Sequence, residues 1–180
     1  VMFFCYCALE STAMLWASSY MALGKGIDKT TAAMWGSLFC IGITVGRFAS
    51  GFLTMKLSDP AMIRLGQASV LAGIFIMLLP LPHHIGTIAG LMVVGLGCAP
   101  IYPCVIHSTP AYFGKDKSQA IVGMQMACAY VGSMCMPPVF GLIAQHVSVN
   151  LFPWYLVVFL VLMVVMHETL RRKYGDRAAA

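Results

Sequence analysis

Six long runs of apolar residues, separated by short polar connections, constrain this 180-residue chain more than any other feature. A helix needs about 20 residues to cross a hydrocarbon core of about 30 Å, so each run has the length of one membrane span. Only 9% of the residues are charged, whereas soluble domains have about 25%. A soluble globule of this size could not bury so much apolar side chain. The runs cover residues 2–23, 31–55, 63–81, 85–106, 118–144 and 151–166.

These runs predict an all-α membrane protein, a bundle of six transmembrane helices that forms a single domain over residues 1–180. Helices satisfy every backbone polar group internally, as the bilayer requires. The connections, at residues 24–30, 56–62, 82–84, 107–117 and 145–150, are rich in Gly, Pro, Asp, Lys and His, as turns are. The chain begins at Val1 without an initiator Met or a basic leader, so we expect that residue 1 is not the natural start.

Positive charge is divided unequally between the two ends of the predicted bundle. With six spans, one end carries nine basic residues and the other only Lys25 and Lys29. The nine are Arg47, Lys56, Arg64, Lys115, Lys117, Arg171, Arg172, Lys173 and Arg177. The positive-inside rule therefore predicts a multi-pass protein of the cell membrane with both chain ends in the cytoplasm. The net charge of +5 is too small and too divided to indicate a nucleic-acid partner, and the expected partner is the lipid bilayer.

Glycines and prolines recur inside the runs. Two GxxxG patterns, Gly42 with Gly46 and Gly86 with Gly90, predict close packing of helix backbones. Proline removes a helical hydrogen bond, so prolines within a span predict breaks of the kind found along transport pathways. The predicted helix breaks are Pro100 and Pro103 in the fourth run and Pro137 and Pro138 in the fifth.

Glu10 is the most informative polar residue, because it lies about midway along the first run. A carboxylate there is costly unless it faces water, pairs with a cation or holds a proton. A carboxyl group that can bind and release a proton is suited to proton coupling; the alternative is a neutral glutamic acid bonded to a neighbouring helix. Tyr6 and Tyr20 fall broadly on the same helix face. Further candidates are Tyr102, Gln125 and Tyr130, for which the alternative is interhelical hydrogen bonding.

Patterns typical of metal sites and enzymes do not occur. The five histidines are dispersed without an HxxxH or HExxH spacing, and the seven cysteines lie in apolar runs as small hydrophobic residues. No nucleophile motif, Walker A sequence or dinucleotide-binding glycine pattern occurs either. We therefore expect no metal, no cofactor and no enzyme activity, and we expect a proton gradient rather than ATP as the energy source.

Several segments together resemble the C-terminal half of a major facilitator superfamily transporter, most closely the fucose-permease-like sugar:proton symporters. The segments are Glu10-Ser11-Thr12 with Trp16, the loop signature from Gly46 to Asp59, the Gly/Pro-rich stretch from Gly95 to Pro103, and the stretch from Ser118 to Gly141. The resemblance implies helices seven to twelve of a twelve-helix fold, built from two inverted three-helix repeats, with an N-terminal six-helix half missing as a partner. It also implies a conformational role for the loop residues Gly46, Arg47, Gly51, Lys56 and Asp59.

One departure concerns that loop, which usually carries an acid and a glycine where this chain has Met55 and Ser58. In addition, the best-established proton-coupling acids of the family lie in the missing half, so Glu10 does not inherit their role by motif.

The predicted function is secondary active transport of a small polar, sugar-like solute by alternating access, coupled to protons. The side chains expected to line one wall of the solute site are Tyr6, Glu10, Tyr20, Tyr102, Gln125 and Tyr130. Two alternatives remain at this point: efflux of a drug or metabolite, and a structural membrane protein that transports nothing.

Overall fold

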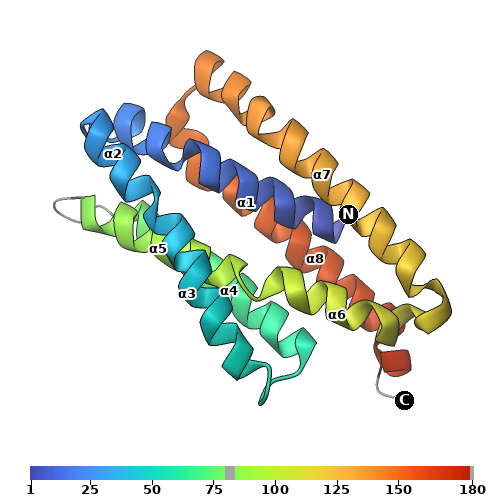
Figure 1. Ribbon diagram of the computed structural model, residues 1–180. Helices are drawn as coiled ribbons and strands as arrows, with labels where there is room; N and C mark the ends of the chain where they lie inside the picture. The colour runs from blue at the N-terminus through green and yellow to red at the C-terminus, as the bar shows by residue number, and fades with distance from the viewer. Residues whose placement is uncertain (80–83, 179–180) are drawn as a thin grey trace.

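The computed structural model describes residues 1–79 and 84–178, and within these ranges the chain is helical without strands (Figure 1). Its helices are α1 (Met2–Ser19), η1 (Tyr20–Gly24), α2 (Lys29–Gly36), α3 (Leu38–Leu53), α4 (Asp59–Leu78), α5 (Ile85–Cys98), α6 (Ile101–Phe113), α7 (Lys115–His146), η3 (Val149–Leu151) and α8 (Phe152–Ala178). The α2/α3 pair and the α5/α6 pair each take the place of one predicted span. The predicted all-α bundle is confirmed.

Among the residues that the structure describes, five helical stretches are long and apolar enough to cross a membrane: Lys29–Leu53, Asp59–Leu78, Ile85–Phe113, Asp116–His146 and Val149–Lys173. The first predicted span is not among them. Helix α1 and the π-helical η1 follow each other directly and extend over roughly 34 Å at 1.5 Å per residue. They lie centrally and pack against α7 and α8 (Figure 1). The polar residues of α1 are tolerated because protein, rather than lipid, surrounds most of this helix.

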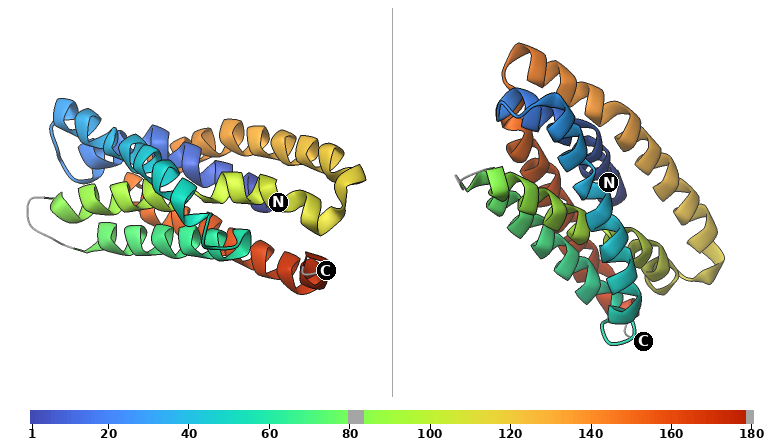
Figure 2. Two further views of the ribbon diagram at one scale, coloured as in Figure 1. Left: turned by 60° about the horizontal axis from the view of Figure 1, so that its bottom comes forward. Right: turned by 60° about the vertical axis from the view of Figure 1, so that its left-hand side comes forward.

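The helices pack as two three-helix units with matching contacts. The first unit comprises α1, the α2/α3 pair and α4, and the second comprises the α5/α6 pair, α7 and α8. Helix α1 packs against α7 and α8, while α5 packs against α3 and α4 (Figure 2). In each unit the first helix thus contacts the second and third helices of the other unit. This reciprocal pattern is the one expected of inverted repeats in half of a transporter fold.

Glycines allow α4 and α5 to approach each other at backbone distance. A Cβ built on Gly73 would lie 2.7 Å from the carbonyl oxygen of Gly90, and one on Gly90 would lie 2.5 Å from that of Gly73. Gly66 and Gly97 form a second reciprocal pair, at 2.6 and 2.7 Å. In the same way, Gly42 of α3 lies against the backbone of α5. The predicted role of glycine in helix packing is confirmed at Gly42 and Gly90, whereas Gly66 and Gly73 were not singled out in the sequence.

The two ends of the bundle separate the basic residues as the charge pattern predicts. The α1–α2 and α7–α8 connections lie at one end, and the α3–α4 and α6–α7 connections lie at the other with the C-terminus (Figure 1). Lys25 lies in the α1–α2 connection, and Lys29 begins α2. Lys56 lies in the α3–α4 connection, and Arg64 and Arg171 line a hollow beside that connection.

Several helices are longer than predicted. Helix α4 begins at Asp59 rather than at residue 63, and α8 continues to Ala178 rather than ending at residue 166. The predicted connection 107–117 is wrong, because only Gly114 separates α6 from α7. Its polar residues find partners within the helices: Thr109 Oγ1 donates to the carbonyl of Val105 at 2.9 Å. Residues 80–81 of the third predicted span, and most of the predicted connection 82–84, lie outside the described residues.

The helix breaks predicted at prolines have different outcomes in the fourth and fifth spans. The fourth span is interrupted after Cys98, and α6 restarts beyond Pro100, with Pro103 in its first turns. Pro137 and Pro138 were expected to break the fifth span, but α7 continues through both, so this prediction is wrong. A membrane helix tolerates proline where its surroundings satisfy the carbonyl groups that the proline leaves unbonded. At the same level, Trp16 Nε1 donates to the carbonyl of Pro137 at 3.0 Å and connects α1 to α7.

Candidate functional site

Glu10 lies near the middle of α1 and is neither fully buried nor exposed. Among the described residues it forms no ion pair. The polar side chains that influence its carboxyl group are the phenol of Tyr6, one helical turn before it, and the positively charged guanidinium of Arg47. A carboxyl group without a fixed counter-ion, half-shielded by apolar helices, can exchange a proton with water or with a bound solute.

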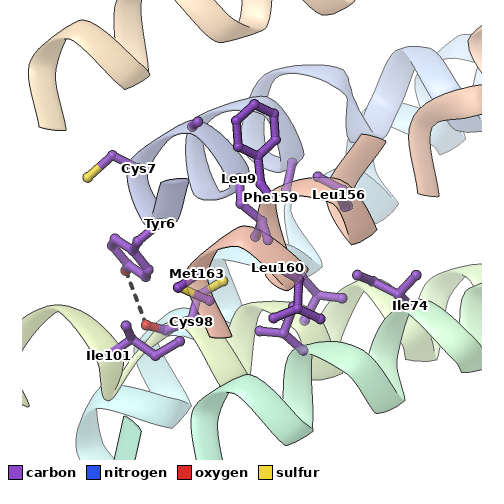
Figure 3. Close-up of a cluster of buried hydrophobic side chains, with 14 of the residues drawn as sticks. Tyr6, Cys7, Leu9, Ile74, Cys98, Ile101, Leu156, Phe159, Leu160 and Met163 are labelled. Carbon is purple, nitrogen blue, oxygen red and sulfur yellow. Dashed lines mark hydrogen bonds between the residues drawn. The ribbon is translucent and has the colours of Figure 1, made fainter. Parts of the chain in front are cut away.

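Tyr6 lies behind Glu10 in the core. Its side chain is 1% exposed, and its hydroxyl donates to the carbonyl oxygen of Cys98 at 3.1 Å (Figure 3). Cys98 is the last residue of α5, so its carbonyl is one of those that a helix end leaves without an intrahelical partner. Tyr6 therefore ties α1 to the interruption between α5 and α6. The predicted place of Tyr6 on an open wall does not fit this conformation, since both its ring and its hydroxyl are enclosed by protein.

Tyr102 and Arg47 meet at a cleft between α3 and α6. The cleft has a volume of about 460 Å³, and its lining is Arg47, Ser50, Gly51, Thr54, Tyr102 and Pro103. The Tyr102 ring centroid lies 6.3 Å from that of Tyr6, and its hydroxyl donates to the Met126 sulfur of α7 at 3.3 Å. The cleft thus joins a predicted wall residue, Tyr102, with two predicted loop residues, Arg47 and Gly51. Its guanidinium and hydroxyl groups are suited to a hydroxylated or anionic solute.

The two polar residues predicted on α7 face different surroundings. Gln125 Oε1 lies 3.2 Å from Thr109 Oγ1 of α6, and Gln125 lines a cavity of about 320 Å³ that is bordered mainly by α6, α7 and α8. Tyr130 is 68% exposed. The two residues therefore do not line one wall, because Gln125 lies at a cavity between helices and Tyr130 lies on the surface of the bundle.

Tyr20 does not join the Glu10 cluster. It is ten residues, about 15 Å, further along the helix, and it begins the π-helical segment η1. Its ring centroid lies 5.0 Å from that of Phe152, and Lys25 Nζ lies 5.7 Å from the ring centroid. The predicted polar stripe from Tyr6 to Tyr20 is thus not one wall, because both rings are buried in packing contacts.

The other residues of the predicted loop signature have different roles: one packs two helices together, and two are charged residues near the start of α4. A Cβ on Gly46 would lie 2.7 Å from the carbonyl oxygen of Leu96, so this glycine packs α3 against α5. Lys56 is exposed in the turn before α4. Asp59, in the first turn of α4, lies 2.6 Å from Nδ1 of His107. No local signal in the sequence pairs Asp59 with His107, because the two residues are 48 positions apart.

The arrangement brings Arg47 and Tyr102 together in the cleft between α3 and α6 and leaves Tyr20 and Gln125 elsewhere. Glu10 does not line this cleft, but it lies on α1 within reach of the Arg47 charge. No group of three His, Cys, Asp or Glu side chains that could hold a metal ion occurs among the described residues.

Comparison with known proteins agrees with this architecture. The family model described as Major Facilitator Superfamily matches residues 1–176, which is nearly the whole chain. The comparison with curated proteins gives no match.

Proposed function

The chain belongs to the Major Facilitator Superfamily of secondary transporters, and from this premise we propose that it is the C-terminal six-helix half of a sugar:proton symporter. It is an integral, multi-pass membrane protein, and proteins of this superfamily are generally not enzymes. In our proposal a small polar solute binds near the bilayer midplane between this half and an N-terminal half, and the two halves rock around it. The fucose-permease-like sequence segments favour a sugar as the solute.

One observation carries the proposal: the Glu10 carboxyl group stands at the centre of the bundle without a fixed ion pair among the described residues. An ionisable group at this depth is functional by default. Arg47 and Tyr102 supply a charge and a hydroxyl group on the adjoining helices. We propose that Glu10 carries the coupling proton, that Arg47, Tyr102 and Tyr130 contact the solute, and that Tyr6 holds the wall in place.

Uptake into proteoliposomes that contain the full-length protein tests this function. We expect radiolabelled monosaccharides to accumulate at least tenfold above equilibrium when the outside is more acidic, and a protonophore to remove the accumulation. The control is liposomes without protein under the same gradient. A failure of every sugar tested to accumulate would reject the sugar symporter.

A second candidate is the efflux of an apolar drug or metabolite, and the exposed side chains of α1 and α7 favour it. Met14, Leu15, Met124 and Met134 are each more than half exposed, and methionine adapts to ligands of varied shape. Efflux predicts that apolar dyes leave loaded vesicles faster with protein than without, while no sugar accumulates.

We further propose that both ends of this chain face the cytoplasm of a cell membrane. Lys25→Cys and Lys56→Cys form a matched pair at opposite ends of the bundle, to be made in full-length protein without its native cysteines. In intact cells a membrane-impermeant maleimide is expected to label Lys25→Cys, and to label Lys56→Cys only after permeabilisation. The reverse pattern contradicts this orientation.

A further inference from the structure

A groove runs between α4 and α8 on the surface of the bundle. It has a volume of about 390 Å³, and its lining includes Leu71, Val161, Val164 and Val165 together with Arg64 and Gln67. A second hollow, of about 660 Å³, continues from it toward the α3–α4 turn and shares Arg64 and Ala68 with it. The two hollows together form one path from an apolar wall to the basic end of the bundle.

The apolar part of this groove faces the hydrocarbon core. Both helices belong to stretches that are long and apolar enough to span a membrane. Leu71 and Val161 are 53% and 52% exposed, and the neighbouring Val165 is 49% exposed. Because the protein is embedded in a bilayer, these side chains contact acyl chains rather than water.

The basic end carries more positive than negative charge. Arg64 donates to Glu168 at 2.6 Å, and Arg172 Nε lies 3.9 Å from the other oxygen of the same carboxylate. Arg171 lines the adjoining hollow with Arg64. Two guanidinium groups therefore lie within 4 Å of one carboxylate and a third lines the same hollow as Arg64, so the surplus positive charge favours an anion at this place.

Gln67 provides an independent indication of a ligand. Its side chain is 4% exposed and lines the groove, and its Nε2 has no hydrogen-bond partner among the described residues. A buried amide without a partner is costly, so an acceptor oxygen in the groove would stabilise it. Gln67 lies one helical turn beyond Arg64, and Leu71 lies one turn further, so all three share one side of α4.

We propose that the groove binds a phospholipid with an anionic headgroup. Along α4 the order is charge at Arg64, a hydrogen-bond donor at Gln67 and an apolar wall at Leu71, over about 10 Å. This order matches the phosphate, the ester carbonyl and the acyl chain of a phospholipid whose headgroup lies at the basic end. Arg64 and Arg171 bind the phosphate, Gln67 Nε2 donates to an ester oxygen, and one acyl chain lies against Leu71 and Val161.

Lipid titration of the full-length protein by native mass spectrometry tests the proposal. The probes are dioleoyl phosphatidylglycerol and dioleoyl phosphatidylcholine, which differ only in the headgroup. Each arginine near an anionic headgroup contributes about fivefold in affinity, so the double variant R64Q/R171Q is expected to bind the anionic lipid about 30-fold more weakly. The control variant K56Q/K117Q removes the same charge from the same end outside the groove, and is expected to bind within threefold of the wild type.

A second variant tests the groove separately from its charges. Ala68 is exposed and lines both hollows, so Ala68→Phe fills the path without a charge change and is expected to weaken binding of the anionic lipid at least tenfold. Three results would each overturn the proposal: equal loss in the two double variants, equal affinity for the two lipids, or unchanged binding by Ala68→Phe.

Discussion

Replacing Gly73 with alanine is expected to lower the free energy of unfolding by about 1–3 kcal/mol, the usual cost of overpacking a close contact. The new Cβ would lie 2.7 Å from both the carbonyl oxygen of Gly90 and the amide nitrogen of Val94. Backbone atoms cannot rotate away as a side chain can, so α4 and α5 have to move apart. Gly73→Leu is expected to leave little folded protein. The measurement is the thermal unfolding temperature of the purified full-length protein in detergent.

Gly123→Ala is the matched control for this prediction. Gly123 is also helical, but a Cβ built there has no neighbour within 4 Å. Alanine is the better helix former by about 0.5–1 kcal/mol, so this variant is expected to unfold at the wild-type temperature or slightly above it. If Gly73→Ala unfolds at the same temperature as Gly123→Ala, then α4 and α5 do not meet at Gly73.

The number and order of the spans could be predicted because they depend on the length of the apolar runs. Helix ends were harder to place. His107 is typical of a turn, yet it lies within α6, where its partner Asp59 is 48 positions away in the chain. The basic residues after residue 166 likewise continue α8, where Glu168 of the same helix pairs with Arg64 of α4.

The composition of the candidate site was only partly predictable. Helix α1 is apolar on nearly every side, so no amphipathic stripe indicates which side chains face a neighbouring helix. Glu10 could be singled out, because an acid is rare at this depth. Burial of Tyr6 and Tyr20 depends on α5 and α8, and the proximity of Arg47 depends on how α3 crosses the bundle. These are tertiary contacts between positions far apart in the chain.

If Glu10 carries the coupling proton, Glu10→Gln is expected to abolish solute accumulation driven by a proton gradient while leaving solute exchange. Glutamine keeps the size of the side chain and its capacity for hydrogen bonds, but it cannot bind and release a proton near neutral pH. Accumulation in proteoliposomes under an inward proton gradient is expected to fall at least tenfold, to the level without a gradient. Counterflow, which moves solute both ways without net proton transfer, is expected to stay within threefold of the wild type. The rate of exchange by the variant is also expected to lose its dependence on pH.

Glu168→Gln is the control that distinguishes the loss of Glu10 from the removal of an acidic residue elsewhere in the helices. Glu168 lies at the basic end of α8 in an ion pair with Arg64, so its removal changes surface charge but not the centre of the bundle. This variant is expected to retain both accumulation and counterflow. Loss of counterflow together with accumulation in Glu10→Gln would make Glu10 a solute ligand rather than a proton carrier. Undiminished accumulation by Glu10→Gln would place the coupling proton on another group, and the acid at the centre of α1 would then serve packing alone.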